Sequence, residues 1–185
     1  MRGAYVGRLL VATTVLDEPT FRRAVVLVLD HNSEGAMGIV VNRPLEVDVS
    51  AVLPDWQPYV TSPGRLFRGG PVQVDSALGV VAVPGDSTEP PGVRRILGSL
   101  GLVDLDTAPE AVARGVSGLR IFAGYSGWGP GQLEREVAED AWYVLDAEPR
   151  DAFSDRPEQL WRDVLRRQRG ELAFVATYPD EASRN

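Results

Sequence analysis

The segment Asp30-His31-Asn32-Ser33-Glu34-Gly35 contains residue types that often carry out proton or metal chemistry. His31 is the only histidine of the chain, and an imidazole exchanges protons near neutral pH. Because there is no second histidine and no cysteine, a metal would need Asp30, Glu34 and water, a set that suits Mg²⁺ or Ca²⁺ better than Zn²⁺. A lone histidine in a loop is more often a hydrogen-bonded turn residue. We favour that interpretation and predict no metal site.

The segment Gly124–Gly131, with the sequence GYSGWGPG, is predicted to be a glycine-rich turn between a strand and a helix. The start of a helix offers free amides to an anion, and Gly127-x-Gly129 is one residue short of the dinucleotide-binding pattern. The segment also lacks only the last glycine of the nucleophile elbow G-x-S-x-G, in which Ser126 would need His31 as its base. A third alternative is a tight turn whose aromatic residues anchor the core, and we favour it.

Two arginines stand beside glycine or proline near the ends of apolar runs, Arg43 in Asn42-Arg43-Pro44 and Arg68 in Arg68-Gly69-Gly70-Pro71. Such a pair can hold a carboxylate or phosphate through bidentate hydrogen bonds. The alternative, which we favour, is that both arginines pair with some of the 26 acidic residues. Further arginines are interpreted as a solvated helix face, with a partner-binding face as the alternative: Arg156, Arg162, Arg166, Arg167 and Arg169.

Composition excludes several kinds of chemistry. The 19 basic residues are all arginine, the acidic residues number 26, and the net charge is −7. Without lysine or cysteine there is no Schiff-base lysine, thiol nucleophile, disulfide scaffold or lysine-dependent phosphate loop. The acidic balance argues against a nucleic-acid surface. We also find no signal peptide and no apolar run near the roughly 18 residues of a membrane span, so we expect a soluble cytoplasmic protein without a cofactor.

The elements that position these residues follow from apolar runs and breaks. Runs bounded by turn residues predict strands at 9–12, 24–30, 38–42, 77–83, 93–97, 100–105, 119–123 and 142–145, with an edge strand at 172–176. Helices are predicted at 107–115, at 132–141 and from 155 to 170, and capping boxes open the first and third of them. Because strands dominate the first half and helices come late, we predict an α+β fold. A length of 185 residues fits one domain.

Three segments together carry a family resemblance. DHNSEGAMGIVVNRP (30–44), GGPV (69–72) and GYSGWGPGQLE (124–134) resemble, in order and spacing, the signature of the YqgE/AlgH family. The resemblance extends from about Gly7 to Arg167, and the run from Leu172 to Pro179 departs from it. We expect a flexible N-terminus at 1–6, a single domain at 7–178 and a frayed tail at 179–185.

The resemblance implies a strongly bent, mixed or antiparallel β-sheet that branches into a pseudo-barrel, with a few flanking helices. It implies no established activity. The family motif has alanine or serine at the position of Ser126, which argues against a required nucleophile. Some members carry the label of transcriptional regulator, with a link to alginate control. The acidic charge and the lack of a helix-turn-helix pattern argue here against direct contact with DNA.

We therefore expect a non-enzymatic binding or regulatory protein whose partner is a protein or a small molecule. The alternative is a small-molecule or nucleotide-dependent enzyme that uses the turn at 124–131. The motif segments form either one shared cleft or separate structural corners. They supply the candidate ligand-binding residues: His31, Asn32, Glu34, Arg43, Gly69, Gly70, Tyr125, Ser126 and Trp128.

Overall fold

Ten strands and four short α-helices form the part of the chain that the computed structural model describes, residues 3–179. The strands are β1 Arg8–Ala12, β2 Val25–Asn32, β3 Gly35–Val40, β4 Pro44–Asp48, β5 Arg65–Arg68, β6 Val72–Ala82, β7 Val93–Leu97, β8 Leu100–Val103, β9 Gly118–Trp128 and β10 Trp142–Asp146. The α-helices are α1 Pro109–Ala113, α2 Gln132–Ala138, α3 Leu160–Arg166 and α4 Glu171–Val175. The 3₁₀ helices are η1 Val49–Ala51, η2 Pro54–Tyr59, η3 Pro149–Phe153 and η4 Pro157–Gln159.

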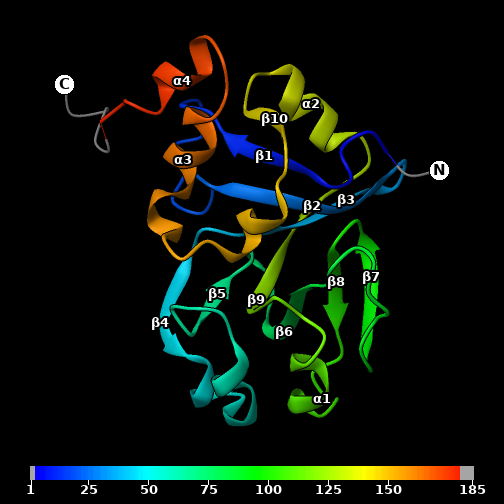
Figure 1. Ribbon diagram of the computed structural model, residues 1–185. Coiled ribbons are helices and arrows are strands. Elements are labelled where there is room, and N and C mark those ends of the chain that lie inside the picture. Colours follow the sequence, from blue (N-terminus) through cyan, green and yellow to red (C-terminus); the bar gives the residue numbers. More distant parts are fainter. Residues whose placement is uncertain (1–2, 180–185) are drawn as a thin grey trace.

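The strands follow the order β10-β1-β2-β3-β9-β6-β8-β7, and β5 and β4 lie off this path beside β9. Every pairing is antiparallel except that of β5 with β9. In Figure 1, β1, β2, β3 and β10 form an upper layer beneath α2, α3 and α4, whereas β4 to β8 form a lower layer that ends at α1. β9 runs from one layer to the other.

β9 belongs to both layers because its neighbour on one side changes along its length. In its first half it pairs with β5, where Phe122 lies beside Phe67. In its second half it pairs with β3, where Ser126 lies beside Gly38. Strand β6 pairs with its other side. Gly124 lies between the two halves with a φ of 75°, which glycine adopts without strain. The sheet therefore branches at Gly124.

Gly69, the residue after β5, connects the two branches. Its N–H donates to Ala123 O at 2.9 Å. Its carbonyl accepts the Val40 N–H at 2.8 Å and the Ser126 hydroxyl at 3.1 Å. Gly69 thus forms hydrogen bonds with both β3 and β9 at the point where the sheet branches, so these backbone groups are not left without a partner. A Cβ at position 69 would lie closer than 3.0 Å to Gly124 O, so the close approach requires glycine.

The upper strands are buried on both faces, which explains their uninterrupted apolar sequences. Along β1, Leu9 and Val11 belong to one core cluster, and Leu10 and Ala12 belong to another. The first cluster includes Trp161 of α3, and α2 contributes to the second. Successive side chains of a strand point to opposite faces, so one strand serves both clusters.

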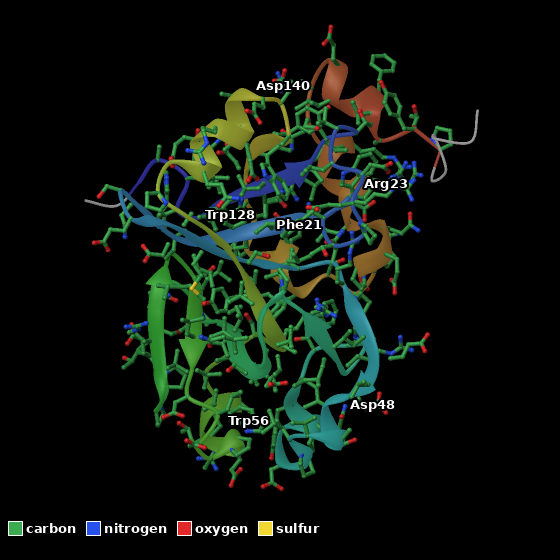
Figure 2. The ribbon with its side chains drawn as sticks, turned by 180° about the vertical axis from the view of Figure 1, so that it is seen from behind. Phe21, Arg23, Asp48, Trp56, Trp128 and Asp140 are labelled. Atoms are coloured by element: carbon green, nitrogen blue, oxygen red, sulfur yellow. The ribbon has the colours of Figure 1, made fainter. Side chains whose placement is uncertain are left out.

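The lower layer has a third core cluster, which contains Trp56 of η2 and Val112 of α1. Figure 2 shows Trp56 near the lower end of the molecule, well below Trp128 of the upper layer. Arg120 of β9 is also buried, and its guanidinium lies 4.2 Å from the ring centroid of Phe67. Burial lowers the pKa of Arg120 to about 10, and two backbone carbonyls accept its hydrogen bonds. Arg120 is therefore a structural cation.

The predicted α+β class and the bent sheet are confirmed, because the strands form a curled, largely antiparallel sheet with few helices. The predicted hairpins are confirmed as well: β2 pairs with β3, and β7 pairs with β8, both antiparallel. The predicted helix at 132–141 corresponds to α2, which ends three residues earlier.

Three local predictions were wrong. Residues 172–176 form most of α4 rather than an edge strand, because Leu172 and Val175 reach the core with helical spacing. Residues 124–128 belong to β9, so only 129–131 remain a turn. Neither predicted capping box forms. The observed capping box joins Glu148 and Asp151 at η3.

Residues 3–6 of the segment predicted to be flexible lie beside β2, where the Gly3 N–H donates to His31 O. Residues 1–2 and most of the predicted tail, 180–185, lie outside the described residues. Within residues 3–179, no helix is both long enough and apolar enough to cross a membrane.

Replacing Gly69 by alanine is expected to lower the free energy of unfolding by about 1–3 kcal/mol, because the new methyl group overlaps the Gly124 carbonyl. Urea unfolding followed by circular dichroism measures this change. Gly85→Ala is the matched control, since nothing lies within 4 Å of a Cβ there. Equal stability of the two variants would contradict the role of Gly69 at the branch.

Candidate functional site

His31 lies near the end of β2 rather than in a loop, and it is 7% exposed. Its ring stacks on Tyr5 with centroids 5.0 Å apart, and its Nε2 contacts the carboxylate of Glu134 on α2. Its Nδ1 accepts the Tyr5 N–H at 3.4 Å, so both ring nitrogens have a partner. The neighbouring Asn32 Oδ1 accepts the Glu34 N–H at 2.7 Å, which closes the β2–β3 turn.

Trp128, the last residue of β9, lies in an aromatic cluster with Trp142 of β10 and Phe21, and Figure 2 shows Phe21 close to Trp128. Glu136 of α2 accepts both indole N–H groups, at 3.1 Å from Trp128 and 3.0 Å from Trp142. Its other oxygen accepts the Gln132 amide at 2.9 Å. One carboxylate oxygen therefore fixes α2 to β9 and β10, and the other accepts a hydrogen bond within the helix.

The remaining turn, Gly129–Gly131, has few free groups for an anion. The Gly129 N–H donates to Gln132 Oε1 at 2.9 Å, and the Gln132 N–H donates to Gly129 O at 3.1 Å. The seven-residue helix α2 that follows carries Glu134 and Glu136, whose charges oppose a phosphate. Among residues 3–179, no three acidic or histidine side chains are grouped so that they could hold a metal ion.

Ser126 is fully buried and donates its hydroxyl to the Gly69 carbonyl. His31 contacts Glu134 instead, so the serine and the histidine do not form the hydrogen-bonded pair that an activated nucleophile needs. Tyr125 is half-buried and packs against the largest core cluster. These side chains all serve the interior.

Arg43 and Arg68, in contrast, line one open cleft of about 310 Å³, which we call the small cleft. Gly70 lies in its wall, so three of the residues that the sequence singled out meet here. The small cleft contains no acidic residue, and its remaining lining comes from Pro19, Thr20, Val40, Pro44 and Leu45.

A second hollow of about 710 Å³, the large cleft, shares Pro19, Arg43 and Pro44 with the small cleft. Its lining has five arginines and three acidic residues: Arg22, Arg23, Arg43, Arg65 and Arg162, with Asp17, Glu46 and Glu158. Asn42 and Trp161 complete it. Both clefts are thus positively charged in a chain whose net charge is −7.

The branch of the sheet positions Arg43. After β3, the chain leaves the upper layer through Asn42 and Arg43 to enter β4. Asn42 is buried, accepts the Val25 N–H at 3.0 Å and donates to Arg23 O at 2.9 Å. Arg43 donates to Arg22 O. The two side chains therefore hold the loop before β2 beside the clefts.

Arg43 has no acidic partner among residues 3–179, although Arg22 pairs with Asp17 at 3.5 Å. Burial lowers the pKa of the Arg43 guanidinium. The predicted pairing of Arg43 and Arg68 with acidic residues is therefore wrong for the described part of the chain. A cation that is removed from water without a counter-ion is costly, and an incoming anion would offset that cost.

The candidate residues thus separate into three places: the α2 contact of His31 and Trp128, the branch with Ser126, and the clefts with Arg43 and Gly70. Sequence reasoning missed the loop arginines Arg22 and Arg23, which no local motif marks. Arg23, labelled in Figure 2, lies with its guanidinium 4.4 Å from the ring centroid of Trp161, a residue far along the chain. Only the folded chain reveals this contact.

Comparisons with known proteins extend over nearly the whole chain. A family model described as AlgH-like matches residues 9–173. A UPF0301 protein of Streptomyces coelicolor is 59% identical, over 97% of this chain and 94% of that protein. A crystal structure from Corynebacterium diphtheriae matches with a TM-score of 0.89 and 32% identity, over 96% of this chain and 95% of that chain. The solution structure of the AlgH protein from Pseudomonas aeruginosa matches with a TM-score of 0.70 and 28% identity, over 98% of both chains.

Glu136→Ala is expected to lower the free energy of unfolding by about 3 kcal/mol, because two buried indole N–H groups lose their acceptor. Chemical denaturation followed by tryptophan fluorescence measures the loss. Glu139→Ala, an exposed change at the end of the same helix, is expected to stay within about 0.5 kcal/mol of the unaltered protein. A Glu136 variant as stable as this control would contradict the assigned contact.

Proposed function

The chain belongs to the AlgH-like family, as the three sequence segments predicted, and from that premise we propose that it is a non-enzymatic binding protein. Its ligand is an anion that binds in the clefts where Arg43 lies. The observation that carries the proposal is the half-buried guanidinium of Arg43, which lies in both clefts and has no acidic partner among residues 3–179.

The positions of the other reactive groups support binding rather than catalysis. Ser126 and His31, the only nucleophile–base pair considered from the sequence, are used in separate structural hydrogen bonds. A ligand in the small cleft would meet guanidinium groups, a threonine and apolar side chains. Guanidinium groups bind and orient carboxylates and phosphates, and they stay protonated at neutral pH.

The charge distribution favours a small anion over nucleic acid. The clefts concentrate positive charge in two hollows, whereas a duplex requires cations spread along its backbone. The net charge of −7 repels a polyanion that approaches the rest of the surface. A regulatory role would therefore act through the bound ligand or a protein partner. The cytoplasmic location stays a prediction.

Arg43→Ala is expected to abolish anion binding, because it removes the one cation common to both clefts. The measurement is a ¹⁵N NMR titration with inorganic phosphate and with acetate. The expected shifts are at the Gly69 and Gly70 amides and at the Arg43 and Arg68 side-chain N–H groups. Arg114→Ala, an exposed arginine change outside both clefts, removes the same charge and serves as control. Shifts that persist in the Arg43 variant would contradict the proposed site.

Ser126→Ala is expected to leave anion binding unchanged and to lower the free energy of unfolding by about 1 kcal/mol, the value of one hydrogen bond. The same titration and a urea denaturation curve measure the two effects. A loss of binding without a loss of stability would favour a direct role for the hydroxyl, as the enzymatic alternative requires.

A further inference from the structure

The two clefts share Pro44 at the start of β4 but otherwise take different side chains from β4 and β5. Successive side chains of a strand alternate between faces. On β4, Leu45 lines the small cleft and Glu46 lines the large one. On β5, Arg68 lines the small cleft and Arg65 lines the large one. The acidic residue Glu46 of β4 therefore lines the large cleft, and the apolar residue Leu45 lines the small one.

The small cleft consequently combines an unbalanced positive charge with an apolar wall. Its two guanidinium groups belong to Arg43 and Arg68, and no carboxylate lines it. The Arg68 side chain makes no ion pair with any residue from 3 to 179. Pro19, Pro44 and Leu45 provide apolar surface beside these charges. This lining matches a ligand with one anionic end and one apolar end.

The volume of the small cleft indicates the size of ligand that would fill it. Its volume of about 310 Å³ equals that of about ten water molecules at roughly 30 Å³ each. A molecule of about ten non-hydrogen atoms fills such a space. An inorganic phosphate is smaller and leaves the apolar wall in contact with water.

From this lining we propose that the small cleft binds a small amphipathic organic acid, with its carboxylate or phosphate between Arg43 and Arg68 and its apolar chain against Pro44 and Leu45. The inference rests on the proposed function and adds the class of ligand. The guanidinium plane matches the two oxygens of the head group. Burial of the chain supplies affinity that a bare anion lacks.

The test compares acetate, butyrate, hexanoate and octanoate by isothermal titration calorimetry, with NMR mapping to locate each ligand. We expect the affinity to rise about fourfold for each methylene that becomes buried, and to level off once the chain fills the cleft. Octyl phosphate, compared with octanoate, shows which head group the arginines prefer. Octanamide has the same chain without the charge, and we expect it not to bind.

Two variants separate the head group from the chain. Arg43→Ala is expected to abolish octanoate binding, whereas Arg114→Ala is expected to leave it unchanged. Leu45→Ser is expected to keep acetate binding and to flatten the dependence on chain length. A thermal unfolding curve for each variant shows that it is folded.

The outcomes distinguish the two proposals. If acetate and phosphate shift the residues of the small cleft as strongly as octanoate does, the ligand class is wrong and the anion site stands. If no anion shifts those residues, both proposals are overturned. If octanoate binds equally to the Arg43 variant, its chain attaches elsewhere on the surface, and the ligand class is again overturned.

Discussion

The carbonyl of Gly69 is the acceptor on which the arrangement of the two layers depends. A sheet that branches leaves backbone groups without ladder partners at the point where the strands separate. Here one carbonyl accepts a backbone N–H from β3 and a hydroxyl from β9, and the N–H of the same residue donates to β9. The contact tolerates no side chain at position 69, because the chain from β5 passes too close to Gly124 O.

The clefts are a consequence of that branch. Where β3 and β5 separate along β9, the chain between β3 and β4 crosses from one layer to the other and brings Arg43 to the junction. Asn42 accepts the Val25 N–H at the start of β2 and donates to Arg23 O, whereas among residues 3–179 the side chain of Arg43 donates only to Arg22 O. The Arg43 guanidinium has therefore lost part of its hydration without gaining a carboxylate from residues 3–179. An anion that binds there would supply the missing counter-charge and offset the free-energy cost of burial.

Much of the fold could be predicted because the strands bury both faces, so their apolar runs are unbroken and easily located. The failures have specific causes. The apolar run at 172–176 is too short to show either helical or strand periodicity. Packing of Leu172 and Val175 against the core favours the helix. At 124–128 the glycine-rich composition predicts a turn, but the glycines instead permit a bend within strand β9. The positions of the candidate residues depend on contacts between residues distant in sequence, such as His31 with Glu134 and Arg23 with Trp161. No spacing in the sequence predicts such pairs. Arg43 and Arg68, in contrast, could be predicted as candidate binding residues, because glycine and proline mark the strand ends beside them.

The shared strand β9 also affects how the protein unfolds. If β9 detached with the other layer, the lower layer would lose an internal strand and the upper layer would lose the strand beside β3, so each would expose a ladder edge without a partner. The shared strand therefore favours unfolding of the two layers together, and native-state hydrogen exchange is then expected to find the slowest amides along β9 rather than in one layer.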